Sequence, residues 1–181
     1  MTGKKAGLRA FGSAAPRLEA CVVEKCGRAG VACAESAAAA LVHCTLSECG
    51  EEGVVVADAA ALSLVHCTVA GCKGPGVDAS GSGRVEVKGG RIGGNVGGVF
   101  MWGDSAAAVR GATVEGGPCH ALLLDRDATA DVEVRATGGS CWGLLGAAGH
   151  IGCGRFCRPP HYAWLLFCAA DGKRGGGSTN V

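Results

Sequence analysis

The feature that most constrains this chain is a gapless internal repeat of 23 residues. Each copy contains an aliphatic residue, a cysteine three positions later, a second aliphatic residue and then a second cysteine, and a glycine–valine pair follows. The three clearest copies are residues 18–26 (LEACVVEKC), 41–49 (LVHCTLSEC) and 64–72 (LVHCTVAGC), with the pairs Gly30-Val31, Gly53-Val54 and Gly76-Val77.

The same register continues in weaker form on both sides of these copies. Counting back 23 residues from Gly30 reaches Gly7, so we expect the chain to enter the array in the middle of a coil. Later members are Val87, Gly90, Ile92 and Asn95 with Gly98-Val99; Val109, Ala112, Val114 and Gly117 with His120-Ala121; and Val132 with Gly143-Leu144.

This period excludes helical repeats of 33 to 47 residues, which are too long. A leucine-rich repeat fits the length, and the spacing from Leu41 to Cys49 partly matches its pattern. However, residues 54–58 (VVVAD) are β-branched and lack a helical stripe, which favours two or three short strands for each copy. Hydrophobic residues make up 48% of the chain, but aromatics only 4%, and 33 glycines are present. That composition suits narrow stacked layers.

These residues resemble the right-handed parallel β-helix repeats of the pectin-lyase-like superfamily, over about residues 7–146. In that family asparagines commonly line the inner turns; here cysteine takes most of their places and Asn95 remains. The resemblance implies an all-β, right-handed parallel β-helix of about five to six coils. We expect the repeats to occupy residues 1–147 and an irregular tail 148–181. Lyases, epimerases, adhesins and ubiquitin-ligase substrate receptors share this fold, so it does not specify a function.

Equivalent residues of successive coils should stack into inward columns. A charge in the middle of a column, such as Leu46→Asp, should therefore prevent folding. The predicted columns are Leu18, Leu41, Leu64, Val87 and Val109; Val23, Leu46, Val69, Ile92 and Val114; and Val31, Val54, Val77, Val99 and Ala121.

Two further columns consist of cysteines, which we interpret as small buried hydrophobic residues rather than as metal ligands or disulfides. Their members are Cys21, Cys44 and Cys67, and Cys26, Cys49 and Cys72. Just before two of these cysteines, His43 and His66 occupy one repeat position and should point outward. They are either duplicated polar residues or a paired-histidine metal site.

No catalytic constellation stands out, and we identify no catalytic or cofactor-binding residue. Polysaccharide-cleaving β-helices need clustered carboxylates, whereas Asp58, Asp78 and Asp104 follow their glycines at different offsets and should not stack. A local group, Glu48, Glu51 and Glu52, is interpreted as a solvated turn.

Phe100 and Trp102 form the one candidate binding patch within the repeats. If Val99 and Met101 face inward, both aromatic rings share the outer face, where they either recognise a partner or pack beneath a loop.

The tail contains Cys153, Cys157, His161 and Cys168, which are ligand types for one zinc ion, although their spacing matches no standard finger. The alternatives are a cap over the last coil or a disordered or non-native end.

The formal net charge of +1 gives no electrostatic signal for nucleic acid or anionic membranes. No secretory signal or membrane-length apolar segment is apparent, which favours an intracellular, cytoplasmic location with reduced thiols. We expect a non-catalytic scaffold with a protein partner, similar to the β-helix part of F-box-type ubiquitin-ligase receptors. The alternative is a polysaccharide-active enzyme, or a fragment of one, with a carbohydrate ligand.

Overall fold

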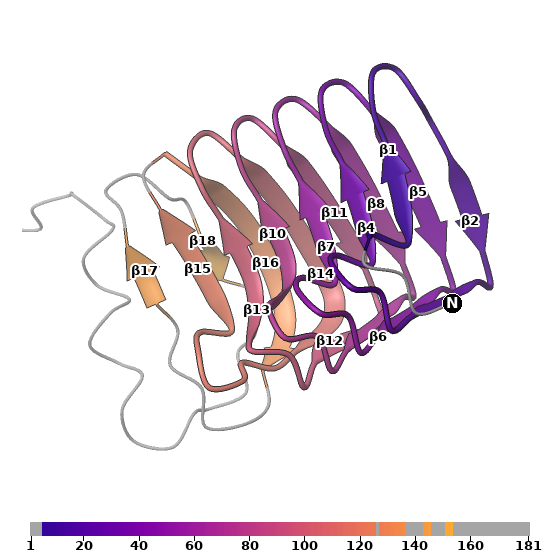
Figure 1. Cartoon of the computed structure of the whole chain (residues 1–181). Helices are drawn as coiled ribbons and strands as arrows, with labels where there is room; N and C mark the ends of the chain where they lie inside the picture. The colour runs from indigo at the N-terminus through magenta and orange to yellow at the C-terminus, as the bar shows by residue number, and fades with distance from the viewer. Residues whose placement is uncertain (1–4, 126, 137–142, 146–150, 154–181) are drawn as a thin grey trace, which may run out of the picture.

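The computed structural model describes residues 5–125, 127–136, 143–145 and 151–153. Within these residues the chain forms short parallel strands joined by turns, without a helix. Figure 1 shows the coils stacked along one axis, with β1 and β2 at one end and β15 and β17 at the other. The result is a β-solenoid of about five turns, as the repeat predicted.

The first strand of each coil belongs to a seven-stranded parallel sheet. From the second coil to the fifth, each of these strands contains the valine of one glycine–valine pair. The seven strands are β1 (Leu8–Ala10), β4 (Val31–Cys33), β7 (Val54–Val56), β10 (Pro75–Ala79), β13 (Gly97–Met101), β15 (Leu122–Asp125) and β17 (Gly143–Leu145).

The second and third strands of each coil form two rows that merge through β14 (Ala106–Val114), which continues across the corner. One row contains β2 (Arg17–Glu19), β5 (Ala38–Val42), β8 (Ala61–Val65), β11 (Arg84–Lys88), β16 (Thr129–Ala136) and β18 (Ile151–Cys153). The other contains β3 (Val22–Glu24), β6 (Thr45–Ser47), β9 (Thr68–Ala70) and β12 (Arg91–Gly93). Three strands in each of these coils exclude the leucine-rich repeat, which has one strand per repeat.

The predicted inward columns are confirmed by strand register and burial. Leu41 pairs with Leu64, and Leu46 pairs with Val69, and all four side chains are at most 1% exposed. The fourth glycine–valine pair, Gly98-Val99, comes one residue earlier than the 23-residue period requires. Its place in the array is also confirmed, because Val77 pairs with Val99. A further inward column, not predicted, contains Ala10, Cys33, Val56, Ala79, Met101 and Leu124.

Two predicted positions late in the array are wrong. Leu122, not Ala121, lies opposite Val99, and the Val99 N–H bonds to the Ala121 carbonyl as the Val31 N–H bonds to the Gly53 carbonyl. Ala121 therefore takes the glycine place, because the spacing returns to 23 residues after the short fourth coil. In the last coil, Gly143 lies opposite Leu123 rather than His120, and Leu144 lies opposite Leu124 rather than Ala121.

The glycine before each valine is required because it faces a corner of the core that has no room for a side chain. A Cβ at Gly53 would lie 2.2 Å from Cγ1 of Val69 and 2.6 Å from the Gly76 carbonyl oxygen. At Gly76 it would lie 2.4 Å from Cγ2 of Ile92. The second inward column therefore fills the space that a larger residue would need.

Left-handed residues form the turns of the coils, in columns that follow the repeat. Such a backbone favours glycine, yet several positions carry other residues. The three columns are Gly12, Glu35, Asp58, Gly81 and Gly103; Ala20, His43, His66, Gly89 and Gly111; and Lys25, Glu48, Gly71 and Gly94. The turns thus recur at fixed places, which keeps the strands above one another.

The predicted division of the chain at residues 147 and 148 lies outside the described residues. Among those that are described, no helix has the length and apolarity needed to cross a membrane.

Candidate functional site: an acidic and aromatic patch on the seven-stranded sheet

The seven-stranded sheet has an outward column that is largely apolar. Side chains alternate along a strand, so the residue between two inward ones points out. In the first coil this column begins with the exposed Arg9 of β1. The strand register then places five outward residues one above another, in the order Ala32, Val55, Asp78, Phe100 and Leu123. The first four are half-buried and Leu123 is buried. One carboxylate thus lies within an otherwise apolar strip.

This position gives the carboxyl group of Asp78 an unusually high pKa. The pKa of its carboxyl is raised from 3.8 to about 6. Burial is the main cause, the nearby carboxylate of Glu52 adds to the rise, and a hydrogen bond with Trp102 opposes it. Glu52 belongs to the preceding coil, just before Gly53. The two acids therefore act on each other across neighbouring coils.

Phe100 and Trp102 lie beside Asp78, on the outer face that the sequence predicted. Their rings are 6.4 Å apart between centroids and meet edge to face at 81°. Trp102 is 37% exposed, whereas Phe100 is half-buried and extends back over Gly97, where a Cβ would lie 2.4 Å from its Cζ. We call Glu52, Asp78, Phe100 and Trp102 the Asp78 patch.

The outer faces of the other two rows have a different character, because charged side chains there pair with each other, either across coils or within one strand. Arg91 makes a two-point ion pair with Glu115, at 3.0 and 2.6 Å. Glu86 accepts from Lys88 at 2.8 Å, and Arg110 pairs with Asp131. These faces are solvated, while the strip from Ala32 to Leu123 on the seven-stranded sheet carries one charged residue, Asp78.

The other acidic residues have structural or solvent-exposed positions. A carboxylate oxygen of Asp58 accepts a hydrogen bond from the Glu35 N–H at 3.0 Å, and Glu35 accepts from the Gly12 N–H at 2.9 Å. Glu51 pairs with Arg28 at 2.9 Å. The interpretation of residues 48–52 as a solvated turn thus missed Glu52, whose interaction with Asp78 depends on coil stacking.

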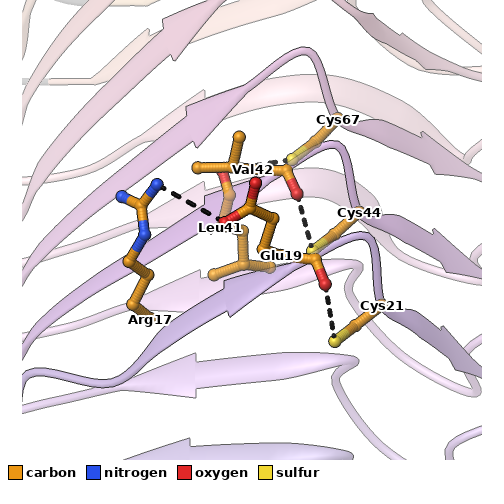
Figure 2. Close-up of polar contacts among 7 residues, drawn as sticks. All are labelled: Arg17, Glu19, Cys21, Leu41, Val42, Cys44 and Cys67. Atoms are coloured by element: carbon orange, nitrogen blue, oxygen red, sulfur yellow. Dashed lines mark hydrogen bonds and ion pairs between the residues drawn. The ribbon is translucent and has the colours of Figure 1, made fainter.

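The first cysteine column is buried along most of its length, as predicted for small hydrophobic residues. Figure 2 shows Cys21, Cys44 and Cys67 in successive coils, each thiol directed at a backbone carbonyl. The Cys44 S–H donates to the Val42 carbonyl at 3.3 Å, and that of Cys67 to the Leu41 carbonyl at 3.4 Å. Burial raises the pKa of the Cys67 thiol, which keeps it neutral and unreactive.

The second cysteine column ends in Asn95, which explains why one residue type can replace the other. Burial raises the pKa of the Cys72 thiol, and a hydrogen bond from the Cys49 backbone opposes that rise. The next coil repeats this contact with oxygen in place of sulfur, since Oδ1 of Asn95 accepts from the Cys72 N–H. The cysteines whose side chains the structure describes, from Cys21 to Cys119, all have free thiols.

The described residues contain no group of three or more histidine, cysteine or acidic side chains placed to hold a metal ion. His43 and His66 point outward, as predicted, and stack on each other. The predicted zinc ligands Cys157, His161 and Cys168 lie outside the described residues, and of Cys153 only the backbone, in β18, is described.

The geometry defines a parallel β-solenoid, and comparison with known families agrees. Residues 1–92 match the family described as the right handed beta helix region. The chain therefore belongs to the right-handed β-helix family. At the level of the fold it is also compatible with the wider pectin-lyase-like superfamily. Neither the curated proteins nor the solved structures contain a match.

Proposed function

We propose that this chain is a non-catalytic β-helix scaffold whose protein partner docks on the Asp78 patch. The main support for the proposal is the difference in polarity between the outer face of the seven-stranded sheet and the outer faces of the other two rows of strands. Charges on the other two rows pair with each other, whereas the outward strip of the seven-stranded sheet is half-buried, apolar and aromatic around one acid. Aromatic side chains of this kind commonly anchor protein interfaces.

The Asp78 patch also suggests the chemistry of the partner. Glu52 and Asp78 raise the local negative charge, so a lysine or arginine flanked by apolar side chains would complement the patch. An arginine there could also stack on the exposed ring of Trp102.

The experiment is a quantitative pull-down from native extract with the wild-type chain, Trp102→Ala and the control Arg84→Ala, which removes an exposed charge from β11. A protein retained by the wild type and by Arg84→Ala, but lost with Trp102→Ala, supports the proposal. Equal retention by all three variants, or capture of no protein, contradicts it.

A finer proposal is substrate recognition in a ubiquitin ligase, at an intracellular location. It rests on the resemblance of the repeats to the β-helix part of F-box-type receptors, and a ligase role would need further sequence. The test is whether the captured partner is ubiquitinated less in cells that express Trp102→Ala than in cells that express the wild type. Equal ubiquitination of the partner in both kinds of cell would contradict a role in a ubiquitin ligase.

A polysaccharide-active enzyme is the second candidate, and the acid pair favours it. Such enzymes use one carboxyl of raised pKa as general acid and a second carboxylate as base or nucleophile. Asp78 and Glu52 have this character, and a nearby aromatic pair could contact a sugar ring. Release of reducing or unsaturated ends from a polysaccharide panel, lost in both Asp78→Asn and Glu52→Gln, would establish the enzyme and overturn the scaffold.

A further inference from the structure

His43 and His66 form a cluster that the proposed function does not use. They occupy the same turn in successive coils, directly after β5 and β8, whose ends pair at Val42 and Val65. The His43 N–H donates to the Val65 carbonyl at 2.8 Å, and the His66 N–H donates to the Lys88 carbonyl at 2.7 Å. Both backbones have a φ of 52°, so the two Cβ atoms leave the chain in the same direction.

The two imidazole rings are exposed and close together. Their centroids are 5.3 Å apart and their planes differ by 8°. Within the described residues neither ring has a hydrogen bond or an ion pair to another side chain. The ring nitrogens are therefore not engaged by other side chains, and apart from Nδ1 of His66, which lies against Gly89, they can bind a ligand from solvent.

Small residues flank the pair on both sides. The same turn carries Ala20 in the preceding coil and Gly89 in the following one. The His66 ring lies against Gly89, where a Cβ would be 2.5 Å from Nδ1. Cys44, next in sequence to His43, points inward with its thiol on a carbonyl and does not compete.

From this juxtaposition we propose that His43 and His66 form a two-histidine site for a divalent transition metal ion of the Cu²⁺, Ni²⁺ or Zn²⁺ class. Imidazole nitrogen suits these ions. Metal–nitrogen bonds of about 2.0–2.1 Å place two ligating nitrogens roughly 3 Å apart. The χ2 torsion of histidine is soft, so tilting the exposed ring edges together closes the gap without moving the backbone. Water completes the coordination.

The position of both histidines is costly for the fold, which is consistent with a functional role. A left-handed conformation disfavours residues with a Cβ, and at this turn the preceding coil carries only the small Ala20 while the next two coils carry Gly89 and Gly111. The proposal does not depend on the partner or activity discussed above.

Nickel titration tests the site, because Ni²⁺ does not oxidise thiols as Cu²⁺ does. The variants are His43→Asn, His66→Asn and the double variant, with His120→Asn as the matched control elsewhere on the chain. Asparagine removes the imidazole while tolerating the left-handed backbone, so the fold should survive. Circular dichroism checks that it does.

We expect each single variant to weaken the tightest Ni²⁺ binding by about tenfold or more, and the double variant to weaken it little further. This non-additivity is the signature of a chelate, and His120→Asn should change nothing. Unchanged binding in the single variants, or additive losses that indicate two independent histidines, would overturn the proposal.

A gain-of-function variant and thermal melting complete the test. Ala20→His places a third imidazole in the same column, beside His43, and should tighten Ni²⁺ binding by about tenfold or more. Ni²⁺ should also raise the melting temperature of the wild type and leave that of His43→Asn unchanged. If Ala20→His binds no tighter, or if both proteins are stabilised equally, the column does not present its side chains to one ion.

Discussion

The side chain of Asn95 bonds to two backbone groups of the preceding coil. Its Oδ1 accepts from the Cys72 N–H at 2.9 Å, and its Nδ2 donates to the Val69 carbonyl at 3.0 Å. Asn95 is 2% exposed, so water cannot replace either bond. The amide thus joins two coils at a corner where the earlier coils use a thiol.

Asn95→Ala should lower the free energy of unfolding by about 2–4 kcal/mol, because it leaves a buried N–H and a buried carbonyl without partners. Asn95→Cys should cost less, since a sulfur at this place can still accept from the backbone, as Cys72 does. Urea denaturation of the three proteins measures both. Equal losses would mean that the thiol does not substitute for the amide.

The degree of burial of an inward leucine predicts how much stability is lost when it is replaced by alanine. Leu46 is 0% exposed, whereas Leu18 in an outer coil is half-buried. Leu46→Ala should cost about 2–5 kcal/mol and Leu18→Ala clearly less. Leu46→Asp should abolish the cooperative melt seen by circular dichroism, because an unpaired ion would be buried. A cooperative melt in Leu46→Asp would contradict the column.

Ser105 introduces a hydroxyl into a column of small inward residues. Its Oγ is buried and has no hydrogen-bond partner among the described residues. Neighbouring coils carry Ala60, Gly83 and Ala128 at this place. Ser105→Ala should therefore raise the free energy of unfolding by about 1 kcal/mol, measured by chemical denaturation. Destabilisation would indicate that the hydroxyl has a partner.

Asp78 should make stability depend on pH between about 4 and 6. Its folded pKa of about 6 lies above the ordinary 3.8, so the folded chain binds this proton more tightly than the unfolded chain. The stabilisation that comes from binding this proton in the folded state is complete below about pH 4 and is lost as the pH rises through about 6.

Asp78→Asn should remove this dependence, because the amide stays neutral at every pH. The variant should be more stable than the wild type at pH 7, and the difference should shrink toward pH 4. Melting temperatures across this range test the expectation, with Asp104→Asn, an exposed acid, as the control. A difference independent of pH would contradict the raised pKa.

The buried thiols should be protected from alkylation until the chain unfolds. Burial raises the pKa of Cys33 to about 11, and Cys44, Cys49, Cys67 and Cys72 are also buried, whereas Cys119 is exposed. Iodoacetamide labelling followed by peptide mass spectrometry should modify Cys119 within minutes and the buried cysteines only in denaturant. Rapid labelling of Cys33 in the native protein would contradict its burial.

The coil architecture was accessible from the sequence because stacking makes the repeat visible. Each inward position must be filled in every coil, so Leu41, Leu64 and Val87 recur at one spacing and predict the column. The prediction failed where the spacing changed. After the short fourth coil, the sequence around Ala121 and Leu122 offers two aliphatic candidates, and only hydrogen bonding between coils selects Leu122.

The candidate sites were only partly predictable. Phe100 and Trp102 were placed correctly because alternation along a strand determines which side chains point out. Glu52 was missed, because its effect on Asp78 depends on the lateral packing of two coils rather than on any spacing in the chain. The repeat could have given the signal, since Glu52 lies one residue before a repeat glycine.

The sequence alone determined the class of this protein, since a 23-residue repeat of inward aliphatic and cysteine positions satisfies the backbone and the core only as stacked parallel coils. The tertiary structure decided what those coils present outside. Outward positions are not constrained by the core, so the repeat aligned His43 with His66 but did not indicate that Asp78 meets Glu52 and Trp102. The placement of Asp78 beside Glu52 and Trp102, and of His43 upon His66, follows from the register between coils.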